Sequence, residues 1–428
     1  MICSCRNFVL LILIGIIALF IQEVLPIANR VPFRIIWNSP TFVCKSKYKV
    51  SLNLAKWGIE SNVNQAWQSD TVSLFYATII GLWAFIRNGR RINGGIPERM
   101  DIYAHVNKTI ADVQRILKKS DFSGLGVIDM EFYTPLWKSM MNPVYSIYVN
   151  ESLSDYKSKE NTSGLNDTTI RLRTQLRYES AIRNIMQLTL ETVKKERPGG
   201  LWGYFGYPRC ANNHNSYQCI SRMKSGNQSL NWLYESSTAL YPAHYINRNA
   251  TSLPRHRARQ LIQLMNEALW ISANRLNGPI PIYFYVRYSY EKEKNALLDY
   301  YDLKNIFTQA VDMAQDGIVF WGDHAEFGNC TALSKHMESL IGPLAQKSIN
   351  FAIVCSQEVC GGNGKCIRSD FKDNHIPDIA LESYYRFNLY KKRILASMEP
   401  LSDSYSCVCY PGWSGNNCEI NFTTNSTT

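Results

Sequence analysis

The sequence lacks the signatures of several common enzyme classes. It has no C-x2-C pair and no H-E-x-x-H segment, and its cysteines suit disulfides better than metal ligation, so no metal site is expected. It also has no G-x-S-x-G elbow and no P-loop, which removes the usual signals of serine hydrolases and nucleotide-binding enzymes. His324 follows Trp-Gly-Asp, but a lone loop histidine is usually neither a ligand nor a base. No cofactor is expected.

Long apolar runs are scarce as well. The run from Phe8 to Ile21 follows a lone Arg6; it is short for a membrane span and suits a secretory leader. We expect residues 1–24 to be a signal peptide, with an uncleaved anchor as the alternative because no clean small-x-small site follows. The polar tail, residues 422–428, offers no hydrophobic segment for a lipid anchor. The sequence thus predicts a secreted, extracellular or lysosomal protein with no stable membrane span after leader removal.

Cysteines and glycosylation signals agree with the secretory route. Of the twelve cysteines, Cys3 and Cys5 lie in the leader, and the other ten are an even number that suits disulfides. N-x-S/T sequons, which mark candidate glycosylation sites, occur at Asn107, Asn150, Asn161, Asn166, Asn227, Asn249, Asn329, Asn421 and Asn425.

Acidic residues are fewer than basic ones, which gives a formal net charge of +11. Outside the cell, such an excess favours an acidic polysaccharide or an anionic surface as partner, and not nucleic acid. The basic residues are scattered along the chain, however, and a solvated face explains most of them.

Two carboxylates stand at the centre of the sequence. The apolar residues 126–128 predict a buried strand, and Asp129 and Glu131, one residue apart, should project to one face at its end. Like charges held this close cannot both ionise cheaply, and Phe132 and Tyr133 lower the local dielectric, so one carboxyl should stay protonated near neutral pH. A protonated carboxyl beside an ionised one suits acid catalysis. The alternative is a solvated D-x-E pair.

Helical and strand patterns alternate along the chain. Helices are predicted at 102–117, 172–193, 258–276 and 303–313, and strands at 126–128, 201–207, 282–290 and 317–321. Residues 150–169 are polar and rich in sequons, which predicts an exposed loop. The alternation predicts an α/β fold with a mostly parallel barrel or sheet.

In a parallel barrel, the carboxyl ends of the strands line one cleft. The predicted strand ends carry two acids and several aromatic residues: Asp129, Glu131, Tyr204, Phe205, Tyr285 and Trp321. Aromatic faces pack against sugar rings while carboxylates act on the glycosidic oxygen, so this set favours a sugar-chain hydrolase. For each single aromatic residue, core packing is the alternative.

The composition changes after residue 350. Six cysteines follow the spacing C-x4-C-x5-C, a long gap, and C-x-C-x8-C, and the ending CVCYPGWSGNNC matches an epidermal-growth-factor-like module. The usual pairing of such a module is Cys355 with Cys366, Cys360 with Cys407 and Cys409 with Cys418. The gap, residues 367–406, is long for this module and is interpreted as an insertion that is partly helical at 381–395.

Several motifs together resemble the hyaluronidases of glycoside hydrolase family 56. They are D-x-E at a strand end, LWGYFGYPRC, ALYPAHY, PRHR, PIYFYV, GIVFW, WNSPTFVC and the growth-factor-like ending, and they run from about Phe33 to Ile420. The likeness is close to the animal members that hydrolyse chondroitin. It implies a distorted (β/α) TIM-like barrel over residues 30–350, an EGF-like module over 351–421, and a monomer.

The resemblance also implies endo-hydrolysis of β-1,4 N-acetylhexosaminide bonds in hyaluronan or chondroitin with retention, the acetamido oxygen of the substrate acting as nucleophile. Glu131 would be the acid and then the base, and Asp129 would stabilise the oxazolinium charge. Tyr245 would hydrogen-bond the acetamido oxygen, and Trp321 would wall its methyl group. The other groove residues implied are Tyr76, Tyr204, Phe205, Arg209, Arg257 and Tyr285. Two disulfides are implied as well, Cys44–Cys330 and Cys210–Cys219.

The sequence departs from the family at four positions. Met130 stands where the family usually has Trp, and Thr134 where Arg is common. Phe205 lacks a hydroxyl expected near the reacting sugar, and Arg209 replaces an acid. Two functions therefore remain open: an active endo-hydrolase of chondroitin or hyaluronan, and a glycosaminoglycan-binding relative with weak or no activity. Arg209 would favour the sulfated polymer if it lines the groove, and would matter little if it is a solvated residue.

Overall fold

Parallel strands alternate with helices through most of the protein. The computed structural model describes residues 31–210, 218–248, 254–293, 296–322, 329–369 and 401–422, and every structural statement below concerns these ranges. The central strands are β1 (Arg34–Asn38), β2 (Glu60–Ser61), β3 (Val72–Tyr76), β6 (Leu125–Asp129), β7 (Leu201–Tyr204), β8 (Ala243–His244), β9 (Tyr283–Arg287) and β10 (Gly317–Trp321). Short antiparallel hairpins are formed by β4 (Phe85–Arg87) with β5 (Arg90–Ile92), β11 (Gly364–Arg368) with β12 (Tyr405–Cys409), and β13 (Trp413–Ser414) with β14 (Ile420–Asn421).

The helices surround these strands. They are α2 (Phe42–Tyr48), α3 (Ile102–Ile116), α4 (Trp137–Met140), α5 (Ser146–Lys159), α6 (Asp167–Glu196), α7 (Ser221–Ser229), α8 (Asn231–Ser236), α9 (Pro254–Ala273), α10 (Tyr300–Asp312), α11 (Cys330–His336) and α12 (Gly342–Cys360). A π-helical segment, Met337–Ile341, joins α11 to α12. Single turns of 3-10 helix are η1 (Ala55–Trp57), η2 (Val63–Gln65), η3 (Pro97–Arg99), η4 (Pro143–Tyr145) and η7 (Leu401–Asp403).

The predicted elements are found, with shifts at their ends. β10 has the bounds predicted for the strand at 317–321, and β6 extends the predicted strand 126–128 by one residue at each end. Helix α6 is longer than predicted at both ends. Its earlier start is explained by Asn166, which caps the first turn by accepting a hydrogen bond from the backbone N–H of Thr169 at 2.8 Å.

The exposed loop predicted at 150–169 is wrong, because α5 occupies its first half and α6 begins at Asp167. Its polar residues are compatible with a helix because one face is buried against α6. On that face Asp155 accepts ion pairs from Arg99, Arg177 and Lys159, so a charged residue is buried without being left unpaired. Residues 160–166 form the connection between the two helices.

The strands form two parallel sheets, ordered β2-β1-β10-β9-β8 and β3-β6-β7. Two seams join them. At one, Asn62 follows β2, donates to the carbonyl of Val72 at 2.7 Å and accepts from its N–H at 3.1 Å. At the other, a parallel bridge pairs Phe205, just after β7, with Tyr241.

The inner faces of both sheets share one apolar cluster. Its members alternate along each strand, as side chains on one face of a strand must. They are Ile36, Val72, Leu74, Leu125, Val127, Ala239, Tyr241, Tyr283, Tyr285 and Val319. Tyr76, Phe205 and Trp321 pack on this cluster at the carboxyl ends of the strands. A larger apolar cluster fills the space between the strands and the surrounding helices.

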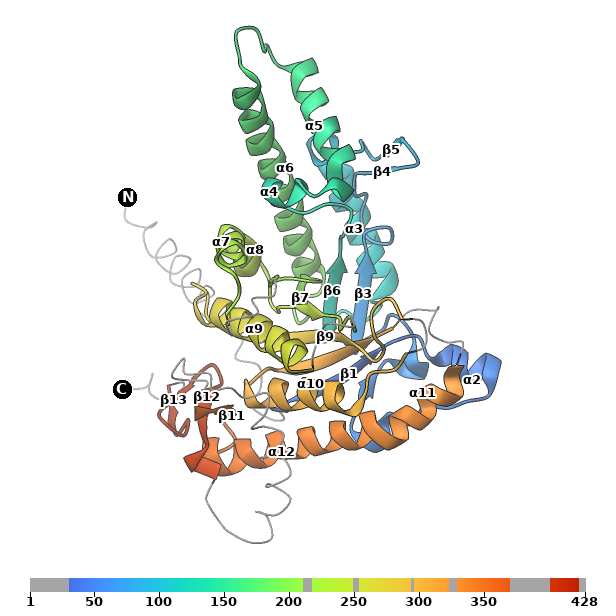
Figure 1. Ribbon diagram of the computed structural model, residues 1–428, viewed down its shortest axis with the longest axis vertical. Coiled ribbons are helices and arrows are strands. Elements are labelled where there is room, and N and C mark those ends of the chain that lie inside the picture. Colours follow the sequence, from blue (N-terminus) through green and yellow to red (C-terminus); the bar gives the residue numbers. More distant parts are fainter. Residues whose placement is uncertain are drawn as a thin grey trace, which may run out of the picture.

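The helices lie on different sides of the strands. In Figure 1, α5 and α6 project upward from β3, β6 and β7, while α10 and α12 lie below the other sheet. Helix α6 packs on α3 and α5, and α10 packs on α9 and α12. The described helices include none that is both long and apolar enough to cross a membrane.

The C-terminal segment is docked on this body. The expected domain boundary at residue 350 falls inside α12, which continues to Cys360. The hairpin β11–β12 is attached to the end of α10: the Tyr405 hydroxyl donates to Asp312 at 2.9 Å, and Lys365 pairs with Asp316 at 2.9 Å. The helix expected at 381–395 lies outside the described residues.

Five disulfides are present, and they are the pairs expected from the sequence. They are Cys44–Cys330, Cys210–Cys219, Cys355–Cys366, Cys360–Cys407 and Cys409–Cys418. The first bridges a sequence separation of 286 residues and links α2 to α11.

Candidate active site

The two carboxylates lie at the end of a fully buried strand. In β6, Leu125 and Val127 face the inner cluster, and Asp129 continues the same row. Gly126 faces the other side, where a Cβ atom would lie 2.3 Å from the Trp202 ring. Glycine is therefore required for this strand to approach β7 so closely. Glu131, two residues further, is solvent-exposed while Asp129 is buried.

The electrostatics of the pair agree with one retained proton. Burial raises the pKa of Asp129 to about 7, with a further contribution from the charge of Glu131. The pKa of Glu131 is also raised, because the surrounding protein removes part of its hydration, and the positive charge of Arg209 opposes this. Because burial and the charge of Glu131 both disfavour ionisation of Asp129, one proton is retained in the site near neutral pH.

Aromatic rings form a wall beside the acids. Tyr245 and Trp321 stack with their ring centroids 5.8 Å apart and their planes 15° apart. Trp67 continues this wall: it stacks on Tyr76 at 5.9 Å and meets Trp321 edge-on at 6.4 Å. Trp67 was not expected from the sequence, since it stands in an irregular segment without a periodic pattern.

Phe205 and Tyr285 lie beneath this wall. The Phe205 ring is 6.2 Å from Tyr245 and 5.3 Å from Tyr285, so it packs where a tyrosine would have offered a hydroxyl. Tyr285 is fully buried, and its hydroxyl donates to the side-chain oxygen of Asn38 at 3.2 Å. Asn38 ends β1 and is a further site residue that the sequence patterns did not indicate.

Strand register brings another residue to the site. Arg287 ends β9 and is the register partner of Trp321, which is itself the partner of Asn38. The Arg287 guanidinium lies 4.8 Å from the Trp321 ring centroid and 5.6 Å from that of Tyr245. The alternation Tyr283, Tyr285, Arg287 along the predicted strand 282–290 was the sequence signal that could have identified it.

Two expected groove residues lie elsewhere. Tyr204 faces the opposite side of β7 from Phe205, is buried, and its hydroxyl donates to the Met186 carbonyl of α6 at 3.2 Å. Arg257 forms a buried ion pair with Asp302 at 2.9 Å, which joins α9 to α10. Both side chains therefore stabilise the packing of helices, the structure does not bring either to the carboxylate site, and their role in substrate binding stays a prediction.

Arg209 is held at the edge of the site by its backbone. The Asn227 side chain accepts from the N–H of Arg209 at 3.3 Å and donates to its carbonyl at 2.8 Å. The guanidinium lies over the Tyr207 ring, 4.7 Å from its centroid, and its charge acts on Glu131. Arg209 is half-buried, so it is not the fully solvated residue that was the alternative.

Asn227 itself is not available for glycosylation in the folded protein. It is 3% exposed, and its amide nitrogen also donates to Glu267 at 2.8 Å, so the folded structure leaves no room for a glycan there, and glycosylation at this sequon stays a prediction. Other sequon asparagines are exposed, and these are Asn107, Asn150, Asn161, Asn166 and Asn329. Asn421 is half-buried, and Asn249 and Asn425 lie outside the described residues.

The segment after Glu131 is anchored to α6. Tyr178 donates to the carbonyl of Thr134 at 2.6 Å, and Glu179 accepts from the N–H of Trp137 at 2.8 Å. Met130 and Thr134, two of the departures from the family pattern, are buried at 3% and 2% exposure. They face packed protein and not the groove. His324 lies outside the described residues.

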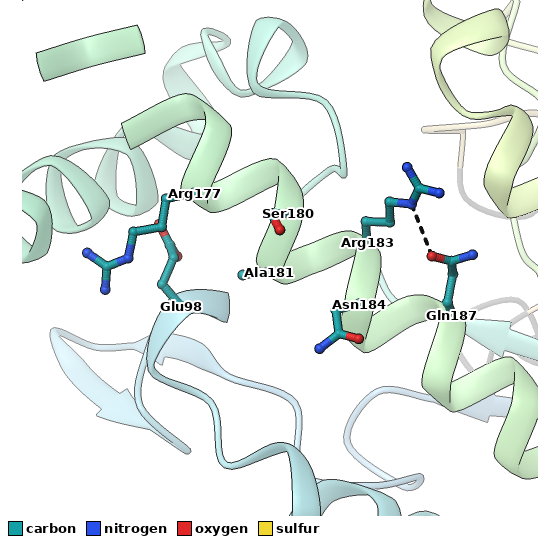
Figure 2. A pocket seen from close by; sticks show the side chains of 7 residues that line it. All are labelled: Glu98, Arg177, Ser180, Ala181, Arg183, Asn184 and Gln187. Atoms are coloured by element: carbon teal, nitrogen blue, oxygen red, sulfur yellow. Dashed lines mark hydrogen bonds between the residues drawn. The ribbon is translucent and has the colours of Figure 1, made fainter. Parts of the chain in front are cut away.

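A separate polar cavity of about 620 Å³ lies between η3 and α6. It is lined by Glu98, Arg177, Ser180, Ala181, Arg183, Asn184 and Gln187 (Figure 2). None of these residues belongs to the carboxylate site, so this cavity and the candidate active site are different places.

Comparison with known proteins matches this geometry. A family model described as hyaluronidase, glycoside hydrolase family 56, matches residues 22–422. The chain is 30% identical to hyaluronidase-1 of Cerastes cerastes, over 93% of this chain and 92% of that protein, and 31% identical to hyaluronidase-4 of the same organism, with the same coverage. Bee venom hyaluronidase in complex with a hyaluronic acid tetramer has a similar fold, with a TM-score of 0.68, 24% identity, and coverage of 74% of this chain and 99% of that one.

The family match spans both the strand that carries Asp129 and Glu131 and the C-terminal disulfides. The curated relatives are matched over nearly their whole length. The chain therefore belongs to the hyaluronidases of glycoside hydrolase family 56, and it is a glycoside hydrolase.

Proposed function

We propose that this protein hydrolyses internal β-1,4 N-acetylhexosaminide bonds of chondroitin, hyaluronan or both, with retention of configuration. The observation that supports this most directly is the carboxyl pair Asp129 and Glu131, whose raised pKa values keep a proton available beside an aromatic wall. Bee venom hyaluronidase, which has a similar fold, binds a hyaluronic acid tetramer in its complex, and this supports the same class of substrate here.

Glu131 is the exposed member of the pair and can reach a bound polymer. In the proposed first step its carboxyl donates a proton to the glycosidic oxygen, while the acetamido oxygen of the same sugar attacks the anomeric carbon and the bond to the leaving sugar breaks. The ring that forms carries positive charge, which the Asp129 carboxylate offsets. In the second step water attacks the anomeric carbon, Glu131 accepts a proton from that water, and the bond between the anomeric carbon and the acetamido oxygen breaks, which restores the acetamido group.

Tyr245 and Trp321 fit the roles of holding the acetamido group. The Tyr245 hydroxyl would donate to the acetamido oxygen, and the Trp321 face would contact the acetyl methyl. The stacked arrangement of the two rings supports this, because a flat acetamido group fits beside parallel aromatic faces. Tyr76 and Phe205 extend the apolar surface beyond the reacting sugar.

We propose, further, that the two sheets close into a distorted TIM-like barrel over residues 30–350. The Asn62 contacts with β3 and the bridge from Phe205 to Tyr241 support closure at the two seams. The segment 351–421 is proposed to be an EGF-like module, supported by its three disulfides and its two hairpins. Signal-peptide cleavage and a secreted or lysosomal location remain part of the proposal.

One feature favours a second function, glycosaminoglycan binding with weak or no hydrolysis. Phe205 occupies the place of a tyrosine, and the loss of one hydrogen bond to a transition state can reduce a rate by about a hundredfold or more. Phe205 keeps two aromatic contacts, with Tyr245 and Tyr285, so the apolar surface of the site is retained without that hydroxyl.

The deciding experiment measures reducing-end release from chondroitin and hyaluronan by the purified protein between pH 4 and 7, with Glu131→Gln as the matched variant. We expect the wild type to release reducing ends and Glu131→Gln to release almost none while still binding polymer, because the amide keeps the shape of the acid but has no proton to donate. Binding without release by the wild type would support the second function. Turnover by Glu131→Gln above a few per cent would remove Glu131 from the acid role.

A further inference from the structure

Arg287 lies in the layer of side chains that forms the floor and wall of the site. The register aligns it with Trp321, and Trp321 with Asn38, across three neighbouring strands. Register partners in a parallel sheet project to the same face, so these three side chains share one level above the inner cluster. In the other sheet, Asp129 is aligned with Tyr76 in the same way. Arg287 therefore stands at the carboxyl end of its strand, as the catalytic acid pair does.

Its contacts connect two wall residues that come from different parts of the chain. Trp321 ends β10, and Tyr245 follows β8, so the backbone alone does not fix the distance between their rings. The planar guanidinium lies within cation–π range of both rings. A planar cation in contact with two stacked rings restrains their spacing and tilt together.

Its charge also acts on the Tyr245 hydroxyl. Burial and the carboxyls of Asp129 and Glu131 raise the pKa of Tyr245, and Arg287 opposes that rise. The Tyr245 phenol is thus influenced both by a cation and by the acid pair. An arginine at this position offsets the negative field at the hydroxyl that would hold the acetamido oxygen.

We propose that Arg287 is a positioning residue of the hydrolytic site, which holds Tyr245 and Trp321 as one rigid wall for the acetamido group. The expected effect on turnover rests on the proposed function. The expected effect on the arrangement of the wall rests only on the contacts among the three side chains. Because the wall must orient the nucleophilic oxygen in the transition state, Arg287 acts on kcat more than on KM.

The test compares Arg287→Met, which keeps a long apolar side chain, with Arg287→Lys, which keeps the charge but loses the planar fork. Arg183→Met is the matched control, since the Arg183 guanidinium also lies over a tryptophan ring, that of Trp232 at 5.6 Å, on the outer helix α6. We expect Arg287→Met to lower kcat about tenfold with less than about a twofold change in KM, Arg287→Lys to be intermediate, and the control to match the wild type.

A double-mutant cycle with Trp321→Phe separates positioning from a general structural effect. If Arg287 acts through the wall, its removal costs less in kcat when Trp321 is already altered. An unchanged or increased kcat in Arg287→Met, or strictly additive losses in the cycle, would overturn the inference.

Near-ultraviolet circular dichroism provides a readout that does not depend on turnover. Arg287→Met should change the aromatic signal while the far-ultraviolet spectrum and the Tm stay within error of the wild type. If the wild type fails to cleave either polymer, the proposed function fails, and this spectrum still decides whether Arg287 organises the wall. An unchanged aromatic spectrum would count against it.

Discussion

Asp129 and Glu131 have the same chemistry but different environments. Asp129 is buried at the end of β6, and Glu131, two residues further along the chain, is exposed. Under the proposed function this difference suits different tasks, because an exposed carboxyl can reach a bound polymer while a buried one is held in a fixed position. Two acids at adjacent inward positions could not be told apart from the sequence, which gives their spacing and not their burial.

The raised pKa of Asp129 predicts a trade between activity and stability. Its folded-state pKa is about 7, above the ordinary value of 3.8, so the folded state binds this proton more tightly than the unfolded state does. The stability linked to this group is fully present below pH 4 and is lost as the pH rises towards 7. Asp129→Asn never ionises and should therefore gain relative stability over that window, by at most about 4 kcal/mol.

Thermal unfolding at pH 4 and pH 8 measures this effect. We expect the Tm of Asp129→Asn to exceed that of the wild type at pH 8 and the difference to shrink at pH 4, while hydrolysis is severely impaired at both. A variant that is less stable than the wild type at pH 8 would contradict the assignment of Asp129 as a buried, reluctantly ionised group.

Arg209 predicts a preference between substrates. A half-buried guanidinium close enough to act on Glu131 can meet sulfate or carboxylate through paired N–H donors, and chondroitin often carries sulfate where hyaluronan does not. We expect a higher kcat/KM for chondroitin than for hyaluronan, with the gap narrowing as salt rises. Arg209→Asp, assayed on both polymers at two ionic strengths, should lose more of its kcat/KM on chondroitin than on hyaluronan. Equal losses of kcat/KM on the two polymers would contradict a role of the Arg209 charge in substrate preference.

At the scale of single residues, the sequence predicted which kinds of residue meet at the candidate active site. It did not predict which face of its strand each residue occupies. Tyr204 and Phe205 are adjacent, so only one of them can face the groove, and the aromatic pattern treated them alike. Arg257 is polar and follows a motif, yet its partner Asp302 lies 45 residues away and could not be seen. Arg287 was not indicated because it is a single charged residue in a strand that is otherwise aromatic and apolar.

Helix α6 supports the site through contacts with the segment 131–137. The Tyr178 hydroxyl is buried and donates to the carbonyl of Thr134. Tyr178→Phe should leave that carbonyl unpaired, lower the free energy of unfolding by about 1–3 kcal/mol, and reduce kcat because the segment that carries Glu131 is less restrained. Tyr405→Phe is the control: it also loses a tyrosine hydroxyl contact, a part-buried one with Asp312, but far along the chain from the acids. Equal losses of kcat in both variants would count against a specific role.

Periodicity found the long elements because each buries one face against the strands. It predicted α3 as a helix over 102–117, close to its bounds, since its apolar positions recur regularly. It failed at α5, where buried Asp155 and Ser152 made a packed helix resemble a loop. Short strands such as β8, with two residues, carry no pattern long enough to recognise.

At the scale of the whole molecule, the C-terminal segment behaves as part of the fold. Helix α12 packs on α10 and also carries Cys355 and Cys360, so its last turns belong to both regions. A chain truncated after Asn350 should lose part of α12 and the β11–β12 contacts, and should show a lower Tm and poorer secretion. Truncation after Phe422 is the control and should match the full chain. Wild-type Tm and activity in the shorter chain would establish residue 350 as a true domain boundary.

The buried position of Asn227 has a consequence for biosynthesis. In a chain that enters the secretory route as proposed, its sequon would be offered to the glycosylation machinery before folding, whereas in the folded protein its amide is enclosed by Arg209, Tyr234 and Glu267. A glycan added there could not be accommodated, so modification and folding compete for the same side chain. The rate at which α7 and α9 come together would then set the fraction of newly made chains that pass quality control.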